Sequence, residues 1–286
     1  MKVSVIIPSL NPDEKLICVV DSLREAGFDD IILVNDGSDE NHMEPFEHVL
    51  AYPECTILTH EVNKGKGRGL KTAFEYCIKN RPDIDGVVTV DGDNQHKAAD
   101  ILKCCEKMAE CKDKVVLGVR NFSGKDVPFK SRFGNNMTSF VFKFACGLNI
   151  SDTQTGLRAI PRQYLELFDK VKGERFEYET NMLLEFKQSH IDFVEVQIET
   201  VYIEENASTH FNPIKDSLKI YGVIFKFLFS SIASSVIDLA MFALISALMF
   251  GKLDGSIRIF TATLGARIIS SLFNYTFNRK AVFNSK

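Results

Sequence analysis

Two aspartates one residue apart form the part of the sequence best suited to chemistry. Asp91 and Asp93 flank Gly92, directly after the apolar run Gly-Val-Val-Thr-Val at residues 86–90. Two carboxylates beyond a strand end, with a glycine that lets the backbone turn, can hold one hard divalent cation whose other ligands are diphosphate oxygens. An Asp-x-Asp pair is also common in plain surface turns, so the loops around it decide between the two interpretations.

The elements that must position this pair follow a repeating pattern. Short β-branched runs alternate with helical patterns, which predicts an α/β fold with a mostly parallel sheet and helices on both faces. Ligands in such folds bind at the carboxyl ends of the strands, where the polar loops of this chain are expected to meet. The runs cover residues 3–7, 30–34, 56–59, 86–90 and 115–119, and the helical patterns cover residues 13–26, 43–50, 67–79 and 98–110.

A glycine-rich loop follows the third run. The sequence Gly-Lys-Gly-Arg-Gly at residues 65–69 is not a P-loop, because Leu70 stands where the second glycine of that motif belongs. A dinucleotide fingerprint is also excluded, because the loop after the first strand has no glycine. A cationic loop whose Lys66 lies against a diphosphate remains, with a solvated turn as the alternative.

Four ordered motifs carry a family resemblance. They are Pro-Ser-Leu-Asn at 8–11, Asn-Asp-Gly-Ser at 35–38, Asp-Gly-Asp-Asn-Gln-His at 91–96 and Asp-Thr-Gln-Thr-Gly-Leu-Arg at 152–158. Their order resembles the inverting family 2 glycosyltransferases of GT-A (Rossmann-like) fold. Within that family it is most similar to dolichyl-phosphate mannose synthases and bacterial polyprenyl-phosphate glycosyltransferases. The resemblance covers about residues 2–222.

The resemblance implies roles for residues at matching positions. Asp91, Asp93 and Gln95 are expected to bind Mg²⁺ or Mn²⁺, and Arg120 and Arg132 to hold the phosphates of donor and acceptor. The catalytic set is expected to be Asp91, Asp93, Arg120, Arg132 and Asp152. The nucleotide-sugar site is expected to contain Pro8, Leu10, Asn11, Asn35, Asp36, Lys66, Asp91, Gly92, Asp93, Gln95, Arg120 and His210.

Three positions depart from the family pattern. Pro12 stands where the family often has Glu, and Asn35 where it has a second Asp. These two changes leave the base, guanine or uracil, undetermined. His210 stands near the place of a family lysine. It either substitutes for that lysine or is a structural histidine.

The acceptor that the resemblance implies needs no general base. A phosphate monoester has a second pKa near 6, so a polyprenyl phosphate is already ionised at neutral pH. Asp152 is then expected to orient an arginine or a sugar hydroxyl, with general-base work as the alternative. Apolar residues at three- and four-residue spacing along residues 128–146 predict a helix that carries Arg132, facing either the membrane interface or the core.

The last quarter of the chain predicts a membrane hairpin. Two apolar runs, at about residues 227–250 and 257–278, each carry one internal charge, Asp238 and Arg267. At ~1.5 Å per residue each run spans a ~30 Å hydrocarbon core, with a buried soluble hairpin as the alternative. Lysines and arginines flank the hairpin, which predicts both ends in the cytoplasm. Asp238 and Arg267 lie at similar depth and are expected to pair, unless each faces water or another subunit.

The domain organisation follows from these two parts. Residues 1–222 are expected to form a cytosolic catalytic domain. Residues 223–286 are expected to form a membrane domain that resembles the GtrA-like family, although that family usually has four spanning helices. The chain is thus expected in the cytoplasmic membrane as a multi-pass protein, and association of copies through the membrane helices is a further option.

Composition excludes several other classes. The 286 residues carry a net charge of −4, which argues against a protein that binds nucleic acid through its phosphates. The seven cysteines contain no Cys-x-x-Cys pair, which indicates free thiols rather than a zinc site. The apolar stretch at the N-terminus is too short for a signal peptide.

The sequence therefore predicts a membrane-anchored enzyme. It would move a hexose from a UDP- or GDP-sugar to undecaprenyl or dolichyl phosphate on the cytosolic face. One alternative is a sugar-1-phosphate nucleotidyltransferase, although the loop Pro-Ser-Leu-Asn-Pro lacks the glycines and arginines typical of that class. The other is a translocation or scaffold role of the membrane domain in lipid-linked sugar transport.

Overall fold

The structure, a computed structural model, describes residues 1–122, 129–143, 147–199, 215–252 and 254–279. Internal contacts divide the chain into two compact units, Met1–Asn212 and Pro213–Lys286. The boundary expected at residue 222 falls inside one continuous helix, α8 (Lys215–Leu248).

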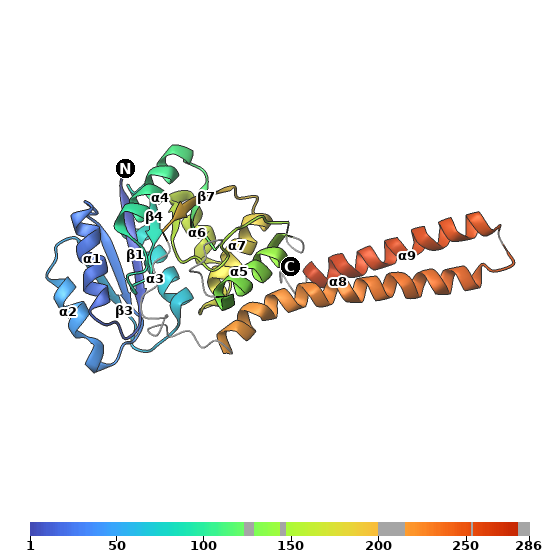
Figure 1. The fold of residues 1–286 in the computed structure, drawn as a ribbon, viewed down its shortest axis with the longest axis horizontal. Helices are drawn as coiled ribbons and strands as arrows, with labels where there is room; N and C mark the ends of the chain where they lie inside the picture. The colour runs from blue at the N-terminus through green and yellow to red at the C-terminus, as the bar shows by residue number, and fades with distance from the viewer. Residues whose placement is uncertain (123–128, 144–146, 200–214, 253, 280–286) are drawn as a thin grey trace. The chain divides into compact units, whose positions relative to one another are not determined.

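The first unit contains a seven-stranded sheet in the order β3-β2-β1-β4-β6-β5-β7 (Figure 1). Strand β6 is antiparallel to both of its neighbours, and the other adjacent strands are parallel. This confirms the predicted α/β class. The strands are β1 (Val3–Ser9), β2 (Ile31–Asn35), β3 (Cys55–Thr59), β4 (Gly86–Thr89), β5 (Val115–Arg120), β6 (Arg158–Pro161) and β7 (Phe193–Ile198).

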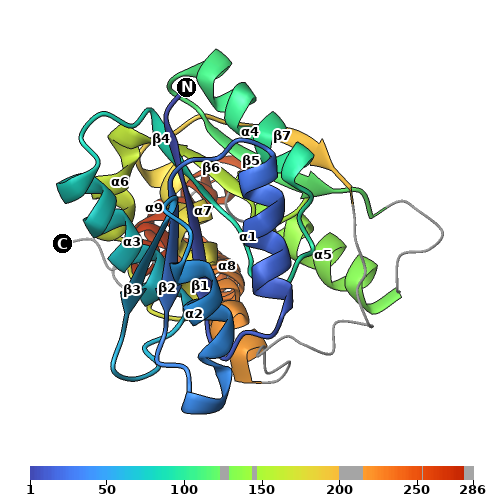
Figure 2. The ribbon, with the colours of Figure 1, turned by 90° about the vertical axis from the view of Figure 1, so that its left-hand side faces the viewer.

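Helices cover both faces of this sheet (Figure 2). Helices α1 (Lys15–Glu25), α2 (Glu44–Leu50) and α4 (Ala98–Cys111) pack on one face, where their apolar side chains join one core cluster with β1. Helix α1 shows why these helices pack on the sheet. Its residues Leu16, Val19, Val20 and Leu23 recur at helical spacing, and all four are buried. Helices α3 (Lys66–Asn80), α6 (Leu165–Asp169) and α7 (Glu177–Gln188) cover the other face.

Sequence reasoning found the first five strands and missed β6 and β7. Strand β6 has the sequence Arg-Ala-Ile-Pro, which contains only one β-branched residue. It forms a strand because β4 and β5 lie on either side of it and supply partners for its backbone. Helices α6 and α7 and the short 3₁₀ turns at Glu40–His42 and Arg162–Tyr164 were also not predicted. The helix expected at residues 128–146 is present as α5 (Phe129–Val141).

The cysteines behave as expected for free thiols. Six of the seven are described, and all six are free. Cys77, Cys104 and Cys105 are buried, and burial raises the pKa of each of these thiols to about 12. They therefore pack as small apolar side chains.

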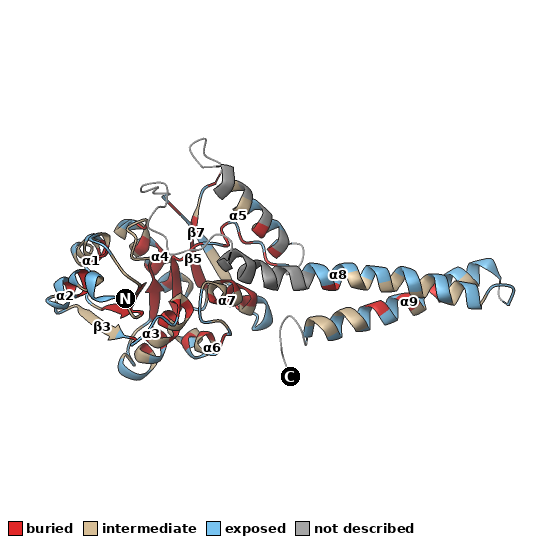
Figure 3. Cartoon of the chain, turned by 90° about the horizontal axis from the view of Figure 1, so that it is seen from below, coloured by how far each residue is buried: buried red, intermediate tan, exposed pale blue. Residues whose placement is uncertain are grey.

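The second unit is a hairpin of α8 and α9 (Gly255–Phe277). The segments Leu228–Leu248 and Gly255–Phe277 are long and apolar enough to cross a membrane. Exposed residues line α9 and the part of α8 from residue 228 onward (Figure 3), and many of these are large and apolar, such as Leu239 at 69% and Phe260 at 70% exposure. A surface of this kind suits a lipid environment.

A row of polar contacts joins the two helices inside these apolar segments. Ser230 Oγ donates to Asn274 Oδ1 at 2.8 Å, and Ser234 Oγ donates to the Ser270 carbonyl at 3.0 Å. One helical turn further, Arg267 Nε lies 3.7 Å from Asp238 Oδ2. The predicted pairing of Asp238 with Arg267 is thus confirmed. Small side chains buried on α9, Ala262 and Ala266, let the backbones approach.

Candidate active site

The loop after β2 fixes the loop after β3. Asp36 is 3% exposed, and its carboxylate accepts hydrogen bonds from the amides of Lys64 at 2.9 Å and Gly65 at 2.7 Å. His60 Nδ1 lies 2.7 Å from the same carboxylate. Asp36 therefore orders the backbone that leads into Lys66. Its expected contact with a nucleoside remains a prediction.

The loop after β1 is tied to the same region. Asn11, at a positive φ of 48°, donates its amide to Ser38 Oγ at 2.8 Å and accepts the Asp39 amide at 2.9 Å. Asn35 is buried, and its side-chain oxygen accepts the Ser38 amide at 2.9 Å. The first two polar loops thus form one bonded unit. Pro8, near the end of β1, and Leu10, just after that strand, were also expected at this site, and both are half-buried.

Asp91 lies at the centre of a charged cluster beyond β4. Lys66 Nζ is 2.7 Å from Asp91 Oδ1, and His96 Nε2 is 3.7 Å from Asp91 Oδ2. Burial raises the Asp91 pKa, but the attraction of Lys66 and His96 outweighs burial and the net pKa lies below the usual range. Gly156 lies directly against this carboxylate, because a Cβ at that position would collide with Asp91 Oδ2.

Asp93 experiences the opposite balance. Burial and repulsion from Asp91 raise its pKa, although the Gln95 amide donates to Asp93 Oδ1 at 3.1 Å. Lys66 and His96 balance the charge of Asp91 more fully than that of Asp93. Two neighbouring carboxylates in this state favour the binding of a cation. Asp91 and Asp93 thus influence each other electrostatically, and their sharing of one metal site remains a prediction.

A divalent cation fits the chemistry of this donor set. Carboxylate oxygens are the ligands that Mg²⁺ and Mn²⁺ prefer. Among the residues that the structure describes, no group of three or more His, Cys, Asp or Glu side chains forms a complete metal site. Asp91 and Asp93 could therefore hold such an ion only together with other oxygens, for which the phosphates of a bound ligand are suited.

Arg120 and Asp152 form the second charged part of the site. Arg120, the last residue of β5, places its Nε 2.8 Å and its Nη2 3.2 Å from the two oxygens of Asp152. The Arg120 amide donates to the same carboxylate at 3.2 Å. Asp152 is fully buried and the Arg120 side chain is 25% exposed, so the buried carboxylate orients the guanidinium.

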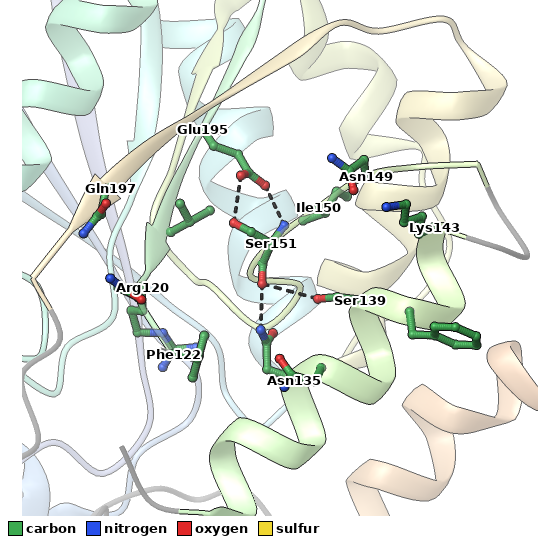
Figure 4. Close-up of a pocket in the computed structure, with 14 residues that line it drawn as sticks. Arg120, Phe122, Asn135, Ser139, Lys143, Asn149, Ile150, Ser151, Glu195 and Gln197 are labelled. Carbon is green, nitrogen blue, oxygen red and sulfur yellow. Dashed lines mark hydrogen bonds between the residues drawn. The ribbon is translucent and has the colours of Figure 1, made fainter. Parts of the chain in front are cut away.

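A pocket of about 680 Å³ opens beside Arg120 (Figure 4). Ser151 lies at its centre and donates its amide and its hydroxyl to Glu195, each at 2.7 Å. Asn135 Nδ2 and Ser139 Oγ, both on α5, donate to the Ser151 carbonyl at 2.6 and 3.3 Å. Amides, hydroxyls and two cationic residues, Arg120 and Lys143, therefore line this pocket.

Two expected site residues are not placed beside these groups by the described contacts. Arg132 is half-buried on α5, and its role at the acceptor remains a prediction. His210 lies outside the described residues.

Sequence reasoning missed Glu179 and underused Arg158. Glu179 Oε2 lies 3.0 Å from Lys66 Nζ, although the two residues are on α7 and α3. Arg158 is 1% exposed and donates to the carbonyls of Thr155 at 3.2 Å and Glu179 at 2.9 Å. Burial lowers the pKa of Arg158. No sequence signal marks Glu179, because only the packing of α7 against α3 brings it to the site.

Comparison with protein families matches residues 4–168 to the model described as glycosyl transferase family 2. Among characterised proteins, the UDP-N-acetylglucosamine–dolichyl-phosphate N-acetylglucosaminyltransferase of Methanococcus voltae is 29% identical over 220 residues, which cover 70% of this chain and 85% of that protein. The undecaprenyl-phosphate 4-deoxy-4-formamido-L-arabinose transferase of Yersinia pestis is 26% identical over 170 residues, or 58% of this chain and 50% of that protein.

A solved structure shares the fold. The glucosyl-3-phosphoglycerate synthase of Mycobacterium tuberculosis, crystallised with Mn²⁺, UDP-glucose and phosphoglyceric acid, superposes with a TM-score of 0.56. It has 16% sequence identity, and the match covers 80% of this chain and 79% of that one.

Proposed function

The chain belongs to glycosyl transferase family 2, and on this premise we propose that it transfers a sugar from a nucleotide-sugar to a polyprenyl phosphate at a membrane. The relatives from Methanococcus voltae and Yersinia pestis, whose names give dolichyl and undecaprenyl phosphate, support this acceptor class. The observation that carries the proposal is the state of Asp152, which is fully buried and held by Arg120.

An Asp152 carboxylate that is already hydrogen-bonded to Arg120 suits an acceptor that is already ionised. An alcohol acceptor needs a base to remove its proton, whereas a phosphate acceptor with a second pKa near 6 does not. The main task is then to bring two negatively charged groups together, which requires cations in fixed positions. Arg120, oriented by two side-chain hydrogen bonds, is such a cation.

The donor is proposed to bind at the carboxyl ends of β1, β2 and β4. The linked first two loops would hold the nucleoside, and Lys66 would face the diphosphate. Asp91, Asp93 and Gln95 are the residues that would hold Mg²⁺ or Mn²⁺. When bound, such an ion stabilises the negative charge of the departing nucleoside diphosphate. A GT-A neighbour crystallised with Mn²⁺ and UDP-glucose is consistent with this proposal.

The acceptor phosphate is proposed to bind at Arg120, in the pocket that Ser151, Asn135 and Lys143 also line. The α8–α9 hairpin is proposed to anchor the enzyme in the cytoplasmic membrane with the catalytic unit in the cytosol. Lysines and arginines on both outer flanks of the hairpin support this orientation. The division into a catalytic domain and a GtrA-like membrane domain belongs to the same proposal.

One experiment tests this function. The purified full-length protein is incubated in detergent with undecaprenyl or dolichyl phosphate, Mn²⁺ and a panel of UDP- and GDP-sugars, and lipid-linked sugar is measured by mass spectrometry. We expect product with one donor class. Absence of product with every donor, from protein shown to be folded, overturns the proposal. Transfer to an added alcohol instead of the lipid phosphate refutes the acceptor class.

A further inference from the structure

Lys66 contacts two carboxylates that come from distant parts of the chain. Its Nζ lies 2.7 Å from Asp91 Oδ1 and 3.0 Å from Glu179 Oε2. The side chains are 18%, 31% and 16% exposed, so this is a partly buried triad rather than a surface pair. Contacts of this kind fix side-chain positions more firmly than solvated ion pairs do.

The backbone keeps Lys66 next to Glu179 independently of Asp91. A Cβ at Gly65 or Gly67 would come within 2.5 Å of the segment that begins α7, including the Glu174 carbonyl and Tyr178 Cβ. The Arg68 amide also donates to the Glu174 carbonyl at 2.9 Å. The start of α3 is therefore packed directly against the start of α7, and this packing places Lys66 beside Glu179.

A cation on Asp91 Oδ1 would compete with Lys66 for that oxygen. A bound Mg²⁺ or Mn²⁺ lies about 2.1 Å from a carboxylate oxygen. The ammonium already lies 2.7 Å from Asp91 Oδ1, so the two positive charges would be in close repulsive contact there. The other oxygen, Oδ2, faces Gly156 and His96, so we expect the ion at Oδ1, which Lys66 would then leave.

We propose that Lys66 neutralises Asp91 until the cation arrives, and that Glu179 is the positioning residue that then keeps Lys66 at the edge of the site. Displaced from Asp91 but held by Glu179, the ammonium is free to pair with the diphosphate that accompanies the ion. The inference rests on the proposed function for its use of a diphosphate. The exchange at Asp91 itself concerns only this chain and the cation.

The test measures Mn²⁺ binding to the full-length protein in detergent, by calorimetry, without nucleotide or acceptor. Lys66→Met removes the competing charge, so Mn²⁺ is expected to bind roughly threefold to tenfold more tightly. Glu179→Gln leaves Lys66 with Asp91 as its only charged partner in this triad, so Mn²⁺ is expected to bind more weakly by a similar factor. With Mn²⁺ present, UDP or GDP should bind Lys66→Met about tenfold more weakly than wild type.

A matched control pair joins α3 to the segment directly before α7. Lys71 Nζ pairs with Glu174 Oε1 at 3.0 Å, and Glu174→Gln breaks this pair without touching Asp91. We expect its Mn²⁺ affinity to equal that of wild type. A loss as large as that of Glu179→Gln would mean that Glu179 acts only by joining α3 to α7, and the proposal would fail.

The double variant decides whether Glu179 acts through Lys66. In the Lys66→Met background, Glu179→Gln should no longer weaken Mn²⁺ binding. An undiminished effect overturns the positioning role, and unchanged or weaker Mn²⁺ binding by Lys66→Met alone overturns the exchange. If Lys66→Met does not fold, the comparison of Glu179→Gln with Glu174→Gln carries the test, and equal affinities refute the proposal. Because no turnover is measured, these outcomes are independent of the transfer assay.

Discussion

Arg120 and Asp152 form a bidentate ion pair in which the carboxylate is fully buried and the arginine side chain is 25% exposed. The Gln154 amide also donates to Asp152 Oδ1, at 3.1 Å. The carboxylate therefore already accepts several protein hydrogen bonds, and a role as a proton acceptor from substrate would require it to give some of them up. Its geometry is that of a residue that orients Arg120.

The first prediction separates orientation from base catalysis. Asp152→Asn keeps one acceptor oxygen for Arg120, so activity should fall by roughly tenfold to a hundredfold, about 1–3 kcal/mol for weakened charge-assisted hydrogen bonds. This variant should retain more activity than Asp93→Ala. The comparison is made by kcat/KM for lipid-linked product. If the two variants are equally inactive, Asp152 does more than orient Arg120.

The second prediction concerns the cation. Asp93→Ala should abolish transfer and Mn²⁺ binding without lowering the thermal midpoint, because Asp93 lies in a half-buried loop and packs little. Excess chelator should abolish wild-type transfer in the same way. Wild-type turnover under either condition would refute a metal-assisted departure of the nucleotide.

The third prediction concerns pH. The Asp93 pKa is raised by burial and by Asp91, so the folded protein holds this proton more tightly than the unfolded chain does. Stability should therefore fall as pH rises from about 4, the ordinary carboxyl value, through the raised folded value. Asp93→Asn removes this cost and should melt at a higher temperature than wild type at pH 7 in chelator, with the difference vanishing below about pH 4.

Thermal melts from pH 4 to pH 8 check this sign. Asp83→Asn is the matched control, because Asp83 is exposed, and its melting curve should follow that of wild type. Identical curves for Asp93→Asn and wild type across the range would show that Asp93 ionises without cost in the fold.

The fourth prediction uses the close approach of Gly156 to Asp91. A Cβ at residue 156 would collide with both Asp91 carboxylate oxygens, whereas a Cβ at Gly134 on α5 would meet nothing within 4 Å. Gly156→Ala should displace Asp91 and weaken Mn²⁺ binding at least tenfold, about the 1.4 kcal/mol of one distorted ligand. Gly134→Ala should leave Mn²⁺ binding unchanged. Equal Mn²⁺ affinities for the two variants would show that Asp91 tolerates the added methyl group.

The fifth prediction concerns the membrane hairpin. Asp238 Oδ2 lies 3.7 Å from Arg267 Nε, and Ser270 Oγ donates to Asp238 Oδ1 at 3.0 Å. An unpaired charge in mid-membrane costs about 3 kcal/mol on insertion scales. Asp238→Arg and Arg267→Asp should each lower the yield of folded protein, and the double exchange should restore it. A double variant as poor as the worse single one would show that each charge has another partner.

Three features could be predicted from the sequence alone. They are the first five strands with the polar loops that follow them, the apolar hairpin, and the place of the Asp91–Asp93 pair after a strand. These features depend on local signals, namely β-branched runs, turn residues and the length of an apolar segment. The pairing of Asp238 with Arg267 was also predictable. In two straight helices joined by a short turn, residues that are equally far from the turn lie at the same depth.

Only the tertiary structure decided which groups meet across the site. Glu179 contacts Lys66 because α7 packs on α3. Asp152 contacts Arg120 because the segment that leads into β6 brings it back to the end of β5. Strand β6 could not be predicted from the sequence, because a four-residue segment with Arg and Pro forms a strand only between two other strands. Contacts between residues far apart in sequence depend on how several elements pack together, and no local pattern of residues encodes that packing.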